Sequence, residues 1–144
     1  MPISQANAAD LPRLFEVWET SVRATHDFLT EAAIDGLKPL VRELLADFTP
    51  LHCLRDDTGR PYAFLGVADD TIEMLFVHPD HRGTGAGRTL VTFAIATAGA
   101  RKVDVNEQNH QATGFYAHLG FRTVRRSPVD PFGNPYPILH LELA

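Results

Sequence analysis

Apolar residues recur at helical spacing through the first third of the chain. Between residues 11 and 22 they fall three and four positions apart, which predicts one face of a helix capped by Asp10. Thr30 is expected to cap a second helix. Gly36 and Pro39 should interrupt that helix, and Pro39 suits the first turn of a third one. The third helix would bury one apolar stripe: Leu40, Val41, Leu44, Leu45 and Phe48.

The middle of the chain changes to short apolar runs, which indicate strands. Residues 51–55 and 62–68 flank a turn rich in Asp and Gly, and residues 71–77 follow a second turn at Asp69 and Asp70. Three successive strands joined by short turns predict an antiparallel meander.

The last part of the chain alternates between strand and helix patterns. After a helix that should end at Gly99, we expect a strand, a second helix and two strands, over residues 102–106, 109–118, 121–125 and 136–143. This order predicts one domain over residues 1–144 of mixed α/β (α+β) class. A mixed central sheet would carry the antiparallel meander in its N-terminal part and helices on both faces.

Composition narrows the class of protein. The 144 residues are 44% hydrophobic and 22% charged, which excludes a disordered chain. The net charge of −5 argues against nucleic acid as a partner, because such binding needs clustered positive charge. The single cysteine suits a reducing compartment. The chain shows neither a signal-like start nor an apolar run of ~20 residues, so we expect a cytoplasmic protein without a membrane partner.

A glycine-rich segment joins the third strand of the meander to the following helix. Its three glycines and two arginines are Gly83, Gly85, Gly87, Arg82 and Arg88. Glycine allows the backbone to approach a ligand closely. Amides in the first turn of a helix lack partners within the helix, and the helix dipole favours negative charge there. A phosphate or pyrophosphate site is therefore predicted, and a tight connection without a ligand is the alternative.

Three phosphate-binding motifs compete for this segment. A Walker A loop needs a Gly-Lys-Ser/Thr triplet, which the sequence lacks. A dinucleotide fingerprint needs wider glycine spacing in a parallel-strand unit. The pattern Arg/Gln-x-x-Gly-x-Gly/Ala fits the run from Arg82 to Gly87. This run resembles the acyl-CoA pyrophosphate loop of the GNAT-type N-acetyltransferases.

A second motif extends the resemblance. The family pattern Asn-x-x-Ala-x-x-Phe-Tyr-x-x-x-Gly-Phe is matched by Asn109, Ala112, Phe115, Tyr116, Gly120 and Phe121. Together the two motifs lie within residues 71–121. Segments 21–29, 105–109 and 135–139 also resemble a small bacterial branch of the family, which implies no particular acceptor.

The resemblance implies the GNAT fold, acetyl-CoA as the acetyl donor, CoA as the product, and direct attack by an amine in a ternary complex. It also implies these cofactor-binding residues: Leu75, Phe76, Val77, Arg82, Gly83, Thr84, Gly85, Ala86, Gly87, Arg88 and Asn109. Asn109 can also cap its helix, and the two roles are compatible. His78, His81 and His110 lack metal-ligand spacing, so no metal site is expected and exposed loop histidines are the simpler interpretation.

Two proton transfers need residues. Tyr116 matches the family's tyrosine acid, since a phenol with a pKa of ~10 is protonated at neutral pH; an ordinary aromatic wall is the alternative. Glu73, on the strand before the loop, is the candidate base if it shares a face with Leu75 and Val77, and a solvated charge is the alternative. His26 is the rival base. Chains of water serve instead in some members of the family.

The sequence therefore predicts a transferase: an acetyl-CoA-dependent N-acetyltransferase that acts on a primary amine of a small molecule, peptide or protein. A non-catalytic acyl-CoA sensor or partner-binding module of the same fold is the alternative, and a domain that binds another anion through the same loop is a third. The acceptor and the oligomeric state stay open, a homodimer being one alternative.

Overall fold

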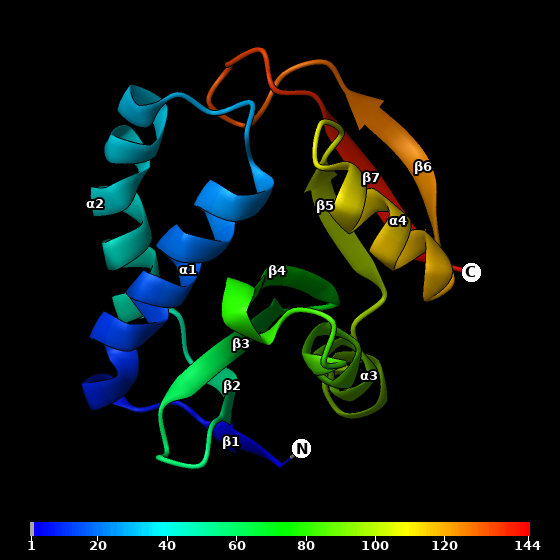
Figure 1. Cartoon of the computed structure of the whole chain (residues 1–144). Helices are drawn as coiled ribbons and strands as arrows, with labels where there is room; N and C mark the ends of the chain where they lie inside the picture. Colours follow the sequence, from blue (N-terminus) through cyan, green and yellow to red (C-terminus); the bar gives the residue numbers. More distant parts are fainter. Residues whose placement is uncertain (1) are drawn as a thin grey trace.

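The computed structural model describes residues 2–144 and contains a seven-stranded sheet (Figure 1). The strands are β1 (Ile3–Gln5), β2 (Leu51–Arg55), β3 (Pro61–Ala68), β4 (Thr71–Val77), β5 (Lys102–Asn106), β6 (Phe121–Ser127) and β7 (Ile138–Leu143). The helices are α1 (Leu11–Thr25), α2 (Glu31–Asp47), α3 (Ala86–Ala98) and α4 (His110–His118), with short 3-10 helices η1 (Ala8–Asp10) and η2 (Pro79–His81).

The strand order is β1-β2-β3-β4-β5-β7-β6. Only β4 and β5 run parallel among the paired strands of residues 2–144, and the other neighbours are antiparallel. The predicted meander is β2, β3 and β4, and the predicted mixed sheet is confirmed. The short strand β1, which pairs with β2, was not predicted because three residues carry too little periodic signal.

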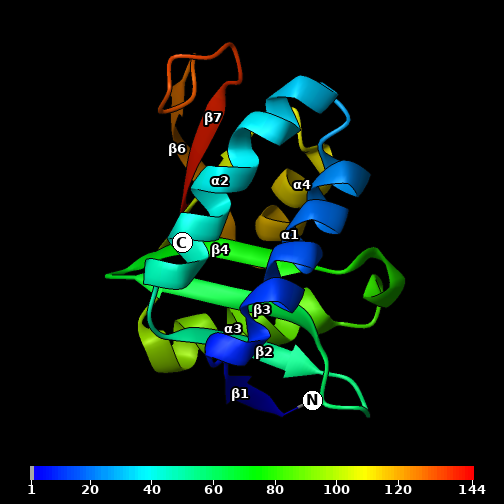
Figure 2. The same ribbon diagram turned by 90° about the vertical axis from the view of Figure 1, so that its left-hand side faces the viewer.

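Helices cover both faces of the sheet, as predicted. Helices α1 and α2 cross one face of β2–β4 (Figure 2), and their core residues include Leu14, Val17, Trp18, Ile34 and Leu45, packed with Phe64 and Met74. Helices α3 and α4 pack on the other face, where the core includes Leu90, Val91, Tyr116, Leu65, Ile72 and Val103. Each fully buried Leu or Phe contributes about 1.5–3 kcal/mol, so the two layers together fix the sheet.

The predicted break at Gly36 and Pro39 is wrong. Helix α2 runs without interruption from Glu31 to Asp47 with Pro39 inside it. The helix continues because Ile34 and Leu45, three turns apart, are both buried on the face that packs against α1 and the sheet. One continuous helix has one buried face, so Leu40 and Leu44 of the predicted stripe are about half exposed.

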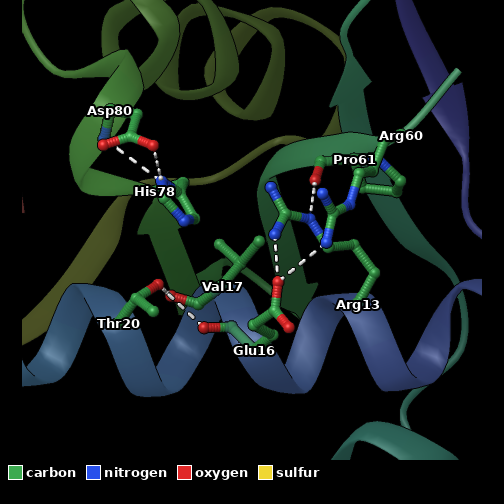
Figure 3. Close-up of polar contacts among 8 residues, drawn as sticks. All are labelled: Arg13, Glu16, Val17, Thr20, Arg60, Pro61, His78 and Asp80. Atoms are coloured by element: carbon green, nitrogen blue, oxygen red, sulfur yellow. Dashed lines mark hydrogen bonds and ion pairs between the residues drawn. The ribbon is translucent and has the colours of Figure 1, made fainter. Parts of the chain in front are cut away.

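Helix α1 begins as predicted, but Asp10 does not cap it with its side chain. The Asp10 carboxylate instead accepts two hydrogen bonds from the Arg55 guanidinium, at 2.8 and 2.9 Å. Farther along α1, Arg13 Nε donates to the carbonyl oxygen of Pro61 at 2.7 Å, and the Glu16 carboxylate pairs with Arg13 and Arg60 (Figure 3). These contacts fix α1 across the start of β3.

The parallel pair β4–β5 is the feature that positions a site. Its ladder consists of Thr71 with Lys102 and Ile72 with Val103, after which the two strands separate (Figure 1). The sheet is therefore open between the carboxyl ends of β4 and β5. Within residues 2–144, no helix has the length and apolar character needed to cross a membrane.

Candidate active site

A β-bulge lies on β4 where the two parallel strands begin to separate. Gly66 of β3 pairs with Met74 and Val67 pairs with Ile72, so Glu73 is the extra residue on β4. The bulge reverses the predicted alternation: Ile72, Leu75 and Val77 pack with the α3–α4 core, whereas Met74 and Phe76 pack with the α1–α2 core. Glu73 therefore does not continue the Leu75–Val77 row in simple alternation, as it would have done without the bulge.

A cavity of about 430 Å³ occupies the opening between β4 and β5. All the candidate residues named from the sequence line it except Thr84. The hydroxyl of Thr84 instead donates to the carbonyl oxygen of His81 at 2.6 Å, which closes the turn. The structure thus brings together Tyr116, Glu73, His26 and Asn109 with the strand and the glycine loop.

The three glycine positions of the loop require glycine for different structural reasons. Gly83 and Gly85 have φ of +72° and +85°, a left-handed conformation that other residues rarely adopt. Gly87 has an ordinary φ, but a Cβ there would stand 3.1 Å from the Phe115 ring of α4. Gly85 is the N-cap of α3, so the free amides of the first turn of α3 lie at the cavity.

Two buried nitrogen atoms at this end of the cavity lack hydrogen-bond partners among residues 2–144: Arg82 Nη2 and His81 Nδ1. An unpaired buried guanidinium nitrogen next to free helix amides suits a phosphate group, so the residues present fit an acyl-CoA pyrophosphate. His78 caps the start of η2, because its Nδ1 accepts a hydrogen bond from the Asp80 amide (Figure 3).

The expectation of exposed loop histidines is wrong for two of the three. His78 is mostly buried, and His81 stacks on the Tyr62 ring with centroids 4.1 Å apart. Both lie in the connection between β4 and α3, which packs back against the start of β3. His110 is exposed, as predicted.

Helix α4 contributes Asn109 and Tyr116. The Asn109 side-chain oxygen accepts from the Ala112 amide at 3.2 Å, so its predicted capping role is confirmed. Tyr116 is 5% exposed and contacts the edges of Phe115 and Phe121. Burial raises the pKa of the Tyr116 phenol above its ordinary value, so the phenol is protonated at neutral pH.

The two candidate bases differ in environment. Glu73 stays exposed, but partial desolvation raises the pKa of its carboxyl, and the negative charges of Asp104 and Asp69 raise it further. Burial lowers the pKa of His26 to about 4, so its ring is neutral at pH 7. The Thr25 hydroxyl donates to the Ser21 carbonyl oxygen, which leaves its oxygen to accept from His26 Nδ1 at 2.8 Å.

Sequence reasoning missed several polar residues that line the cavity: Ser21, Thr25, Asp104, Asn106 and Gln111. Asp104 alternates with the buried residues Val103 and Val105 on β5, which was a signal that it lies on the opposite face from α4. Nothing local in the sequence pointed to Ser21 and Thr25, because α1 reaches the cavity only through its packing over the sheet.

Comparisons with known proteins agree with this geometry. Residues 50–123 match the family described as the acetyltransferase (GNAT) domain. The peptidyl-lysine N-acetyltransferase YjaB of Salmonella typhimurium is 42% identical over 129 residues, which cover 90% of this chain and 88% of that protein.

Solved structures give the same picture. The solution structure of apo-form YjaB from Escherichia coli matches with a TM-score of 0.91 and 39% identity, covering 100% of this chain and 99% of that one. The PaiA N-acetyltransferase of Thermoplasma acidophilum, solved in complex with coenzyme A, matches with a TM-score of 0.72 over 100% of both chains. At 18% identity, that match shows a likeness of fold alone.

Proposed function

The chain belongs to the GNAT family of acetyltransferases, which transfer the acetyl group of acetyl-CoA to an amine, and from that premise we propose that its acceptor is a lysine side chain of a peptide or protein. One observation carries the proposal: besides the glycine loop, the cavity is lined by two carboxylates on the facing strands β4 and β5, Glu73 and Asp104. Carboxylates suit a cationic amine. The relatives named peptidyl-lysine N-acetyltransferase support the same acceptor class.

The layout of the cavity supports separate donor and acceptor sides. The glycine loop leads into α3, which packs on one face of the sheet. Asp104 lies on the other face, because its neighbours Val103 and Val105 pack with the α3–α4 core. His26 at the end of α1 also lies on that second face. A donor bound at the glycine loop and an acceptor bound at Asp104 would therefore meet between β4 and β5.

For the donor, we assign the phosphates to Arg82, Arg88 and the first amides of α3. Leu75, Phe76 and Val77 would line the pantetheine arm, and the Asn109 amide would hydrogen-bond it. Bound acetyl-CoA supplies a thioester carbonyl, at which the C–N bond forms as the C–S bond breaks. All seven strands belong to one sheet, and the helices that line the cavity pack on it. This supports a single domain over the chain.

Glu73 is the proposed base, and it would take one proton from the acceptor ammonium before attack. Partial burial and the neighbouring carboxylates raise the pKa of Glu73, which strengthens it as a base, whereas burial lowers the pKa of His26 to about 4, which weakens that ring as a base. His26 is instead proposed to accept a hydrogen bond through Nε2. The neutral ring already donates from Nδ1 to Thr25, which fixes this tautomer.

Tyr116 is proposed to stabilise the leaving thiolate. Its raised pKa exceeds the ~8.5 of an ordinary thiol, so a hydrogen bond from the phenol to sulfur is favoured over complete proton transfer. The rival function, an acyl-CoA sensor without catalysis, needs no such donor.

Turnover separates the two functions. The wild-type protein is incubated with acetyl-CoA and an N-blocked peptide carrying one lysine, and acetyl-lysine is detected by mass spectrometry. Tyr116→Phe should lower kcat about tenfold to hundredfold with unchanged acetyl-CoA affinity. Acetyl-CoA binding without turnover on peptides or small amines would favour the sensor. Transfer to small amines but never to lysine peptides would reject the proposed acceptor.

A further inference from the structure

A chain of cross-strand side chains ends on Asp104. Asp104 of β5 pairs directly with His140 of β7, and His140 pairs directly with Arg125 of β6. His140 Nδ1 lies 2.8 Å from Asp104 Oδ1, and His140 Nε2 lies 2.7 Å from the hydroxyl oxygen of Ser127. All four residues therefore lie on the face of the sheet opposite α4.

The hydrogen-bond directions in this chain are set by its two ends, because Arg125 can only donate and the Asp104 carboxylate can only accept. Arg125 Nη1 lies 3.4 Å from the Ser127 oxygen. The Ser127 hydroxyl hydrogen is then free to donate to His140 Nε2. With Nε2 accepting, Nδ1 carries the hydrogen and donates to Asp104. Each residue donates to the next, and the chain terminates at a single oxygen, Asp104 Oδ1.

The second oxygen, Oδ2, accepts no hydrogen bond from other residues in the described range 2–144. Asp104 lines the cavity and lies near enough to Glu73 to raise its pKa. A carboxylate with one oxygen held by His140 loses its rotational freedom, so the other oxygen keeps a defined position. The Asp104 side chain is 57% exposed, so an ammonium group that enters the cavity can reach Oδ2.

We propose that Asp104 binds the ammonium group of the acceptor through Oδ2, next to Glu73, and that His140 and Ser127 are positioning residues for Asp104. The inference rests on the proposed lysine acceptor. It divides the work between the two carboxylates: Asp104 holds the ammonium while Glu73 removes its proton. It also gives a role to Ser127, which does not line the cavity but is linked to Asp104 by successive hydrogen bonds through His140.

The test uses steady-state kinetics with acetyl-CoA and the N-blocked lysine peptide. Asp104→Asn should raise the KM for the peptide about tenfold to hundredfold, with a smaller change in kcat and an unchanged acetyl-CoA dissociation constant. Asp57→Asn, the same change in the exposed β2–β3 turn, is the matched control and should leave every parameter unchanged.

Two variants of His140 separate positioning from mere structural support. An asparagine amide nitrogen falls near the position of Nδ1 and can still donate to Asp104, whereas a glutamine amide falls near Nε2 and serves Ser127 instead. We expect His140→Gln to raise the peptide KM severalfold and His140→Asn to restore it toward the wild-type value. Thermal melting checks that both variants are folded.

The outcomes are distinct. An unchanged peptide KM in Asp104→Asn, or equal KM values in folded His140→Asn and His140→Gln, would overturn this inference and leave the proposed function standing. A wild-type protein that binds acetyl-CoA yet acetylates no lysine peptide would overturn the proposed function and the inference with it.

Discussion

Gly87 on α3 faces the Phe115 ring on α4 so closely that a methyl group at Gly87 would lie 3.1 Å from Phe115 Cζ. The first turn of α3, which presents free amides at the cavity, is thus packed against the helix that carries Asn109 and Tyr116. The glycine-rich pattern therefore serves two purposes: backbone conformation at Gly83 and Gly85, and packing between two cavity-lining helices at Gly87.

Relative to Gly114→Ala, Gly87→Ala should lower the free energy of unfolding by about 1 kcal/mol, because the added methyl overpacks the α3–α4 contact. Gly114→Ala on α4 is the control: nothing lies within 4 Å of its Cβ, and alanine should stabilise that helix by up to about 1 kcal/mol. Urea denaturation measures both. In a Phe115→Leu background the cost of Gly87→Ala should disappear; equal costs in both backgrounds would refute the contact.

Arg82→Ala should weaken acetyl-CoA binding about tenfold to hundredfold, since it removes the buried guanidinium nitrogen that lacks a protein partner. Calorimetric titration measures the change. Arg122→Ala, on the exposed face of β6 and outside the cavity, is the matched control. Binding of acetyl-pantetheine, which carries no pyrophosphate, should be the same in Arg82→Ala and the wild type. Equal weakening for both ligands would move Arg82 away from the phosphates.

Much of the fold was predictable because periodic patterns and local caps agree with the tertiary structure. Strands β2, β4 and β5 have the predicted bounds, Thr30 caps the start of α2 and Gly99 the end of α3, as expected. The break at Pro39 failed because tertiary burial of Ile34 and Leu45 outweighs the local cost of a proline inside a helix. Asp10 failed as a cap because Arg55, 45 residues away, takes its carboxylate.

The residues of the proposed donor side could be named from the sequence because they are contiguous in two motifs. Those of the proposed acceptor side could not, because they are assembled across strands: Asp104, His140 and Ser127 are brought together by the β5–β7–β6 register alone. The position of the bulge at Glu73 could not be read from the apolar pattern of β4, since one extra residue in a strand leaves no mark on it.

Activity should fall at acid pH as Glu73 gains its proton. Because its pKa is raised, the acid limb of kcat/KM should lie above the ordinary glutamate value of 4.5. Asp69→Asn removes one of the negative charges that raise this pKa, so the limb should move to lower pH. Asparagine also tolerates the φ of +55° at residue 69. If the acid limb does not move in Asp69→Asn, or is still present in Glu73→Gln, the limb belongs to a group other than Glu73.

His26 should make the folded state sensitive to acid. Its folded pKa of about 4 lies below the unfolded value of 6.5, so the unfolded chain binds a proton first as the pH falls. Stability from the neutral, partly buried ring is fully present above pH 6.5 and is lost progressively toward pH 4. The loss at this one site is on the order of 3 kcal/mol.

His26→Gln cannot titrate, so it should lose less stability than the wild type between pH 7 and pH 4.5. Urea denaturation at both pH values gives the comparison, with His110→Gln on the exposed start of α4 as control. Parallel losses in the wild type and His26→Gln would show that the His26 ring is accessible to protons in the folded state, and would reopen its role as the base.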